Sequence, residues 1–416
     1  MSLYKIIILF FIQQTFQILK LKFETDQIKI INEDKLDFYS LLNNEIYTKF
    51  QIGNPFQEIK CYIKTLLYDF YITEENKKGF YSKNNSNTYY TTSKEISYFH
   101  DSNYKKGYYC FENFNFLNEK NEYFEISNFS TLLVENLNDK NYPCYIGLSY
   151  RDISNDFHRN FFQSLIIAKI IKTINYSIEY INENEGEIII GKLPHEYNLK
   201  YKEKDLKWTQ VYLDNYSSEW KIKFNKIEIG NEKFNGSHIG LLIYENNMIF
   251  GPNEYKEKFL KNVFDKNKCF EFRTINGYYY YKCDESIDLN NLPEISFKSY
   301  DLNYTFVLNK NDLIKKINNK IYLMVYFSNY ENFIWKLGKP FLKKFTFIFE
   351  QDKRLIGFYN KANLFDNKKY FSYFLIFLCI FIIIILSLLL KLSFKKRKKR
   401  SNEIEDMYEY IPEEKI

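Results

Sequence analysis

The stretch from Ile46 to Ile72, IYTKFQIGNPFQEIKCYIKTLLYDFYI, decides how the chain folds. Apolar and polar residues alternate from Tyr47 to Ile52, as in a strand with one buried face. The sequence Gly53-Asn54-Pro55 is typical of a turn, and a second strand begins after it and continues through apolar residues. The stretch therefore predicts a β-hairpin.

This hairpin resembles the start of the first lobe in pepsin-like aspartic peptidases. In that family an Ile-Gly-x-Pro-x-Gln turn leads into a strand that ends in Asp-Thr-Gly-Ser, and residues 52–57 fit the turn. At the family's spacing, Lys64 stands at the position of the catalytic Asp and is followed by Thr65, while Asp69 meets a structural Asp. The resemblance implies the peptidase frame with its first catalytic acid replaced.

Further segments resemble the family in the same order, so that the resemblance covers residues 45–360. It implies an all-β, bilobal pepsin-like aspartic peptidase fold with an N-terminal lobe at residues 23–182 and a C-terminal lobe at residues 183–366. Apolar residues at helical spacing predict a helix over residues 160–172 in the first lobe. The segments are Cys144–Tyr150, Gly186–Gly191, Trp220–Gly230, Leu292–Phe297, Trp335–Phe345 and Arg354–Phe358.

The second catalytic position of the family is occupied by Ile243, counted back from Gly251-Pro252. Aspartic peptidases need two carboxylates that share one proton, one to activate water and one to protonate the scissile carbonyl. Neither Lys64 nor Ile243 supplies a carboxylate. Glu245 is a candidate for a displaced acid, because a shift of two residues keeps the same strand face. We expect the lobe pair to be proteolytically inactive.

The groove of the family binds an extended peptide by strand-like hydrogen bonds, which do not require the acids. We therefore expect a non-proteolytic ectodomain that binds an extended peptide or protein in the inter-lobe cleft. Tyr98 fits the Tyr of the family's flap hairpin, which implies a substrate-binding role. The alternative is that Tyr98 is only a packed strand residue. The alternatives are an active aspartic endopeptidase with a displaced acid and a structural surface glycoprotein with a closed cleft.

Lys64 has two interpretations. In the first, Lys64 forms an ion pair with Glu245 across the former catalytic pair, because a buried lysine is costly unless it is paired. Alternatively, its ammonium group turns to solvent and the base of the cleft is apolar.

Five cysteines precede the apolar C-terminal segment, which holds the sixth, Cys379. Their spacing matches no zinc pattern and the four His residues form no HExxH motif, so we expect disulfides and neither a metal nor another cofactor. The resemblance implies a disulfide between Cys269 and Cys283. The pairing among Cys61, Cys110 and Cys144 stays open.

The two ends of the chain predict secretion and membrane anchoring. Residues 1–22 resemble a signal peptide, and residues 370–390 are apolar enough for a transmembrane helix. A basic run at residues 395–400 predicts that residues 391–416 lie in the cytosol. We expect a single-pass type I membrane protein with a lumenal or extracellular body, at the cell surface or in an endomembrane. The formal charge of +6 is spread along the chain, which argues against nucleic-acid binding.

Smaller motifs complete the predictions. Tyr408 and Ile411 in the tail resemble a tyrosine-based sorting signal. Six sequons predict N-glycosylation in the ectodomain, at Asn84, Asn128, Asn175, Asn215, Asn235 and Asn303.

Overall fold

The computed structural model describes residues 18–360 with short gaps, residues 376–393 and Lys395. The gaps are residues 27–29, 33–34, 37, 76, 101–102, 119, 136–141, 150–159, 214–217, 265–268, 274–278 and 328–333. The chain divides into two compact units, Met1–Asn360 and Lys361–Ile416.

The predicted opening hairpin consists of strands β4 (Ile46–Ile52) and β5 (Gln57–Lys64), which pair antiparallel. Alternate residues of β4 are buried, as the sequence pattern predicts. Gln57 fixes the turn to the following loop, because its side-chain amide donates to the carbonyl oxygen of Ser82 (3.0 Å) and accepts from the Ser82 nitrogen (2.9 Å). The turn motif therefore has a structural role.

An arrangement of five strands occurs twice, in the orders β4-β5-β10-β6-β9 and β14-β15-β24-β16-β23. In both copies the first two strands are antiparallel, the second and third are parallel, the third and fourth are antiparallel, and the last two are parallel. This repeat is the two-lobed, mostly β architecture that the sequence predicts. The further strands are β6 (Phe70–Glu74), β9 (Tyr123–Glu135), β10 (Cys144–Gly147), β14 (Lys221–Ile229), β15 (Glu232–Leu242), β16 (Ile249–Gly251), β23 (Val325–Phe327) and β24 (Ile334–Leu337).

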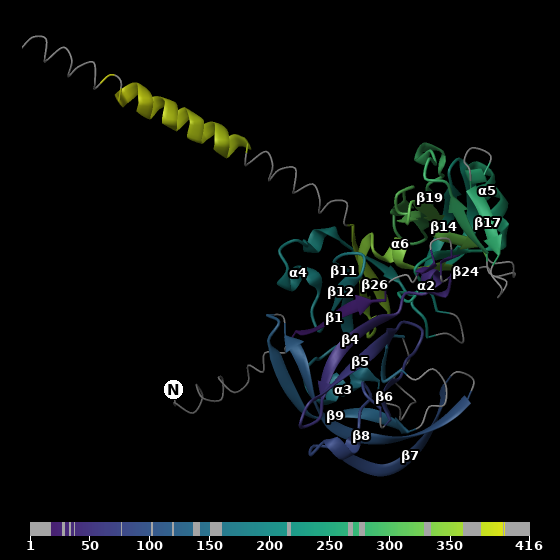
Figure 1. The fold of residues 1–416 in the computed structure, drawn as a ribbon, viewed down its shortest axis with the longest axis vertical. Helices are drawn as coiled ribbons and strands as arrows, with labels where there is room; N and C mark the ends of the chain where they lie inside the picture. The colour runs from purple at the N-terminus through teal and green to yellow at the C-terminus, as the bar shows by residue number, and fades with distance from the viewer. Residues whose placement is uncertain are drawn as a thin grey trace, which may run out of the picture. The chain divides into compact units, whose positions relative to one another are not determined.

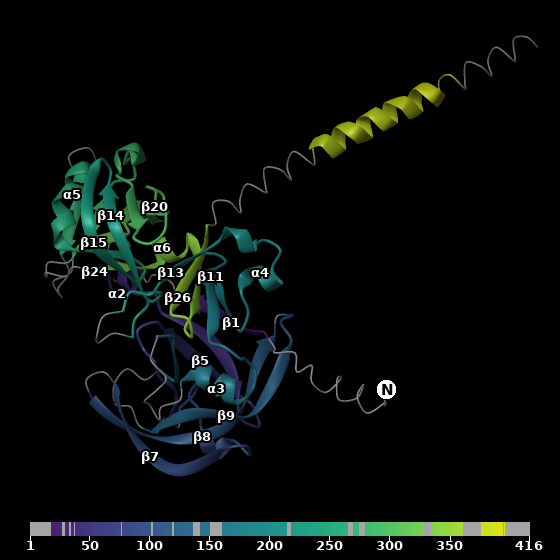
Figure 2. The same cartoon turned by 180° about the vertical axis from the view of Figure 1, so that it is seen from behind.

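A 13-stranded sheet, counted over the described residues, joins the two lobes in the order β13-β26-β25-β11-β12-β1-β4-β5-β10-β6-β9-β8-β7. Its other members are β1 (Leu19–Thr25), β7 (Tyr90–His100), β8 (Asn103–Asn118), β11 (Asn175–Tyr180), β12 (Glu185–Ile190), β13 (Leu206–Gln210), β25 (Phe345–Glu350) and β26 (Leu355–Asn360). Figure 1 and Figure 2 show β1, β11, β12 and β26 between the strands of the first lobe and those of the second.

The second lobe is completed by a 7-stranded sheet, β20-β19-β14-β15-β24-β16-β23, and a 4-stranded sheet, β17-β18-β22-β21. The remaining strands of these two sheets are β17 (Cys269–Arg273), β18 (Tyr279–Cys283), β19 (Ile295–Ser299), β20 (Thr305–Leu308), β21 (Ile314–Ile317) and β22 (Lys320–Leu323). Strands β2 (Ile30–Asn32) and β3 (Lys35–Leu36) pair with each other in a separate sheet. The helices in this unit are short: α2 (Phe38–Leu42), α3 (Phe161–Ile167), α4 (Pro194–Tyr197), α5 (Lys256–Phe264) and α6 (Lys339–Leu342).

One hydrophobic cluster runs through both lobes. Tyr176 stacks on Phe162 and on Phe349, with ring centroids 4.8 and 5.0 Å away. The carbonyl oxygen of Leu148 accepts hydrogen bonds from Trp220 Nε1 (2.7 Å) and from the Tyr176 hydroxyl (2.8 Å). These contacts pack the lobes together and position the loops that meet between them.

Two predicted boundaries can be compared with the strands. Strand β1 begins at Leu19, which is fully buried and pairs with Ile190, so the signal-peptide boundary predicted at residue 22 lies inside a core strand. Residues 1–17 lie outside the described residues, and the signal peptide itself stays a prediction. The predicted lobe boundary falls in the turn at residues 181–184, between β11 and β12.

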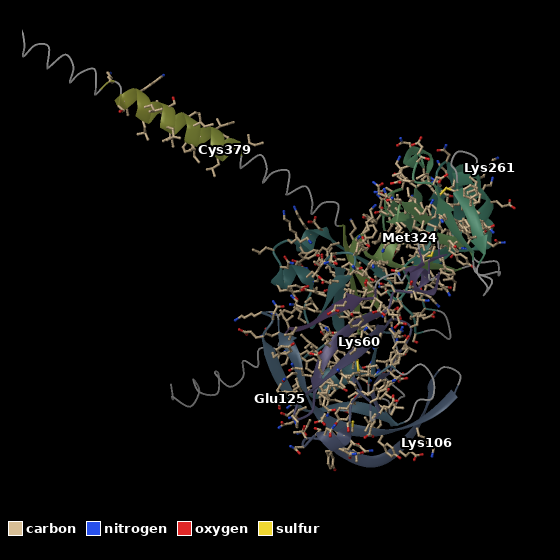
Figure 3. The ribbon with its side chains drawn as sticks, viewed as in Figure 1. Lys60, Lys106, Glu125, Lys261, Met324 and Cys379 are labelled. Atoms are coloured by element: carbon tan, nitrogen blue, oxygen red, sulfur yellow. A yellow bond between two sulfur atoms is a disulfide. The ribbon has the colours of Figure 1, made fainter. Side chains whose placement is uncertain are left out.

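The second unit contains the helix Ile376–Ser393, whose mean hydropathy is 2.9. It is long and apolar enough to cross a membrane, and none of it is buried in the structure. It overlaps the predicted span of residues 370–390 and ends at Ser393. Cys379 lies on this helix (Figure 3).

Candidate functional site

Lys64 and Ile243 lie at the ends of corresponding strands in the two copies of the repeat. In the first lobe β5 and β10 run parallel, with Lys64 opposite Gly147. In the second lobe β15 and β24 run parallel with Leu242 opposite Leu337, which places Ile243 beside the glycine that follows Leu337. Each of the two residues therefore stands where a central strand enters the loop at the contact between the lobes.

Glu245 reaches across this contact to the loop that follows β5. One carboxylate oxygen accepts a hydrogen bond from the main-chain nitrogen of Thr65 (2.5 Å), and the other accepts from the Thr65 hydroxyl. Hydrogen bonds to an ionised acceptor are stronger than those between neutral groups. Glu245 and Thr65 therefore tie the equivalent loops of the two lobes together.

A buried network supports the Glu245 loop from the other side. The main-chain nitrogen of Asn44 donates to the Glu245 carbonyl (2.6 Å), and Asn44 Nδ2 donates to the Tyr244 carbonyl (3.0 Å) and the Tyr180 hydroxyl (2.9 Å). Burial raises the pKa of both tyrosines, and the charge of Glu245 raises the pKa of Tyr180 further. Both tyrosines stay protonated, so they support the loop and do not exchange protons.

The ion pair with Glu245, one of the two interpretations of Lys64, is not present within the described residues. Both oxygens of Glu245 accept hydrogen bonds from Thr65 instead. Lys64 Nζ lies 5.6 Å from the ring centroid of Tyr142, and the side chain is partly exposed. A hydrated ammonium over an aromatic face avoids the cost of burial without a carboxylate partner.

Four tyrosines cover the sheet face beside Lys64. The ring centroids of Tyr62 and Tyr142 are 4.4 Å apart, and Tyr145 lies 5.0 Å from both Tyr142 and Tyr71. Packed rings at these separations attract one another through their edges and faces. The surroundings of Lys64 are therefore aromatic.

The family model for eukaryotic aspartyl proteases matches residues 45–361, which is more than half of the chain. The chain belongs to the eukaryotic aspartyl protease family. The match confirms the resemblance predicted from the opening hairpin, and it covers both copies of the strand repeat. The search of the curated proteins returned no match.

The carboxylate of Glu245 is in direct contact with the loop that begins at Thr65. The arrangement can hold two loops together. Aspartic peptidases depend on a pair of carboxylates that shares one proton. That Lys64 and Ile243 replace this pair stays a prediction.

The disulfides of the homologue are Cys61–Cys144 and Cys269–Cys283. The first joins β5 to β10 close to the lobe contact. It shows which two of the three first-lobe cysteines are paired, which the sequence left open. The second joins β17 to β18, as the resemblance implies. Cys110 is a free thiol buried on β8, and burial raises its pKa. Disulfides of this kind persist in oxidising compartments.

Other predicted site residues lie apart from the lobe contact or outside the described residues. Tyr98 is on β7 opposite Lys105, and its side chain is outside the described residues, as are Asn215, Tyr408 and Ile411. The remaining sequons are exposed except for Asn175, which lies on β11 with its side-chain oxygen buried. The exposed ones are Asn84, Asn128, Asn235 and Asn303.

The described residues contain no group of three or more His, Cys, Asp or Glu side chains that could hold a metal. A hollow of about 160 Å³ lies where β1, β4 and β8 diverge, lined in part by Lys22, Tyr47, Lys49 and Tyr123. None of the residues at the lobe contact lines it, so it is a separate feature of the first lobe.

Proposed function

We propose that this aspartyl protease homologue is a non-proteolytic, membrane-anchored ectodomain that binds an extended peptide or protein segment between its lobes. The observation that carries the proposal is the nature of two equivalent positions, Lys64 and Ile243. The family resemblance assigns the catalytic carboxylates to these positions. An ammonium group and an alkyl side chain stand there instead.

The missing acids account for the predicted loss of hydrolysis. An ammonium group cannot accept a proton from water, and isoleucine has no titratable group. General acid or base groups contribute factors of about 10² to 10⁴ each, and groups that act as a unit lose most of the rate when one is removed. A chain without either carboxylate therefore retains at most a trace of peptidase activity.

A second candidate function is that of an active endopeptidase in which Glu245 is a displaced acid. One observation favours it, namely that the carboxylate lies at the contact between the two lobes. Against it, both oxygens accept hydrogen bonds from Thr65, and no second carboxylate is bonded to Glu245 within the described residues. A lone carboxylate lacks the partner that must carry the shared proton.

Peptide binding does not depend on the acids. Family members recognise an extended chain through main-chain hydrogen bonds, with side-chain pockets for specificity. The β7–β8 hairpin that carries Tyr98 is present, and the tyrosines beside Lys64 offer aromatic contact surface. These features support retention of a binding site after loss of the chemistry.

Membrane anchoring is part of the same proposal. It is supported by the apolar helix Ile376–Ser393 and by two disulfides in the first unit. The basic residues 395–400 favour a cytosolic tail, and hence a single-pass type I orientation. In this orientation the tail presents Tyr408 and Ile411 to the sorting machinery, and the sequons lie on the glycosylated side.

The test is a binding screen with the full-length protein in detergent micelles. Fluorescently labelled extended peptides are titrated with the protein, and binding is followed by fluorescence polarisation. The mass of each bound peptide is then measured by mass spectrometry, which shows whether it has been cleaved. We expect saturable binding of intact peptides, weaker in Tyr98→Ala and unchanged in Tyr90→Ala, a control on the same strand. Absence of saturable binding would favour the structural glycoprotein, and cleaved peptides would favour the endopeptidase.

A further inference from the structure

Lys339, the first residue of α6, is a buried lysine with no carboxylate partner among the described residues. Only 6% of it is exposed. Its main-chain nitrogen donates to the carbonyl of Asn246 (2.8 Å), and its Nζ lies 5.5 Å from the ring centroid of Tyr180. A buried ammonium group without a counter-charge is costly. The fold therefore holds an uncompensated cation beside the loop that carries Glu245.

Two further lysines lie close to this one and share a single acid. Lys315 on β21 and Lys343 at the end of α6 both pair with Glu183, Lys315 at 3.8 Å. Burial and the charge of Lys315 lower the pKa of Lys339 to about 7. Three ammonium groups against one carboxylate leave a net charge of +2 when all are ionised. The cluster therefore has an excess of positive charge that no neighbouring carboxylate removes.

The nearby acids are paired with other lysines. Asp312 binds Lys344 at 2.6 Å, and Glu285 binds Lys316 on the same strand as Lys315. Glu183 lies in the turn between β11 and β12, and 54% of its side chain is exposed. Its carboxylate can therefore turn to water when an anion takes its place.

We propose that Lys339, Lys315 and Lys343 form a binding site for a compact oxyanion of the phosphate type, free or as a phosphomonoester. A phosphate group carries a charge of about −1.5 to −2 at pH 7, which matches the excess of the cluster. Lysine binds phosphate as a point charge. The bound anion connects α6 with β21 in the second lobe and takes the place of Glu183. The site does not depend on peptide binding in the cleft.

The experiment uses the full-length protein in detergent micelles. Sodium phosphate is titrated against sodium chloride at constant ionic strength and pH 7, and the thermal midpoint is followed by tryptophan fluorescence. We expect a saturable rise, because a ligand that binds only the folded state shifts the midpoint. Lys339→Met should weaken phosphate binding about tenfold or more, since a charged partner is removed.

Phosphate also stabilises proteins by exclusion from their surface, so the readout is the difference between variants. Lys316→Met, on the same strand but paired with Glu285, is the matched control and should respond like the wild type. Lys343→Met tests the site at a more exposed position, should Lys339→Met fail to fold. No saturable response in the wild type would overturn the proposal. So would a response of both Lys339→Met and Lys343→Met that equals the wild-type response.

Phenyl phosphate in a parallel titration distinguishes the two sources of the anion. Binding equal to or tighter than that of inorganic phosphate assigns a phosphomonoester, and weaker binding assigns free phosphate.

Discussion

Glu245 accepts two hydrogen bonds from Thr65, and its carboxylate acts as an anchor between the lobes. A partly buried carboxylate needs such donors, because a charge removed from water is costly unless it is hydrogen-bonded. Asn44 holds the same loop through its main chain and side chain. The lobe contact therefore depends on a few polar groups, each of which can be removed singly.

Thr65→Val should destabilise the protein by about 1.5–3 kcal/mol, because the variant loses a hydrogen bond to a charged group. Thr65→Ser, which keeps the hydroxyl, should cost less. In a double-mutant cycle with Glu245→Gln we expect a coupling of about 1 kcal/mol. The free energies of unfolding are measured in urea. Additive effects of the two changes would contradict the contact.

Lys339→Met tests the cost of burying an unpaired ammonium group. Burial lowers the pKa of Lys339 from 10.5 to about 7 in the folded chain. Between pH 7 and pH 10.5 the Lys339 side chain therefore holds its proton in the unfolded chain but loses it in the folded chain. Wild-type stability consequently rises with pH over this range. Below pH 7 the full penalty remains. The charged groups around Lys339 are Lys315 and, beyond it, Lys343 and Glu183; Tyr180 stays protonated.

We expect Lys339→Met to be more stable than the wild type at pH 7. The difference should shrink toward pH 10, by up to about 1.4 kcal/mol per pH unit. Urea unfolding at several pH values measures it, with Lys316→Met as the control. A difference that stays constant with pH would show that Lys339 does not change its charge in this window.

Counting along the motifs places Lys64 and Ile243 at the family's two catalytic positions. In the structure Lys64 ends β5 and Ile243 directly follows β15, the corresponding strand of the second copy, and the loss of the acids stays a prediction. The partner of Glu245 could not be predicted, because a hydrogen bond across 180 residues depends on how the lobes pack. Neither Asn44 nor Lys339 carries a local sequence signal, since the role of each arises from burial.

Among the elements, the opening hairpin shows why its motif was informative. Gly53 has a φ of +86°, and a Cβ there would lie 2.8 Å from the Ser86 hydroxyl, so the turn requires glycine. Helix α3 shows the opposite case, because it ends at Ile167 and not at residue 172. Lys169 adopts a φ of +59° and the Ile170 nitrogen bonds to the Leu165 carbonyl, which closes the helix. Apolar spacing alone does not reveal such a stop.

The strand pairing predicts the disulfide map. Cys61 and Cys144 lie on the adjacent strands β5 and β10, whereas Cys110 is buried on β8. Non-reducing peptide mapping should find Cys61 linked to Cys144 and Cys269 linked to Cys283, with Cys110 alkylated only after unfolding. A peptide that links Cys110 to another cysteine would contradict the strand arrangement.

Removal of the first-lobe disulfide by Cys61→Ala with Cys144→Ala should cost about 2–5 kcal/mol, because the cross-link restricts the unfolded chain over a separation of 83 residues. Cys110→Ala, a change at a buried free thiol, is the control and should cost less. Equal losses in the two variants would show that the cost comes from packing and not from the cross-link.

For the whole molecule, the family assignment, the two-lobed strand repeat and the apolar helix are consistent with a body attached to a membrane. Order, spacing and turn chemistry were sufficient to predict the fold class, because the family's motifs lie at the ends of core strands. The same information did not predict the 13-stranded sheet that joins the lobes. Its pairs join strands that lie far apart in the sequence, such as β1 with β12 and β11 with β25.

Deletion of the chain after residue 360 tests the anchor. The full chain should remain in the membrane pellet after alkaline carbonate extraction, because about 20 apolar residues span a bilayer core. The shortened chain should be recovered in the soluble fraction with unchanged disulfides. Recovery of both chains in the soluble fraction would contradict membrane anchoring.

Hydrolysis of a denatured protein by the purified full-length chain, followed from acid to neutral pH, tests the central claim most directly. We predict that the wild type releases no more peptide than Glu245→Gln, because the equivalent positions Lys64 and Ile243 provide no proton-sharing pair. Cleavage that Glu245→Gln abolishes, and that an inhibitor mimicking the tetrahedral intermediate also blocks, would contradict the claim and identify Glu245 as a working acid.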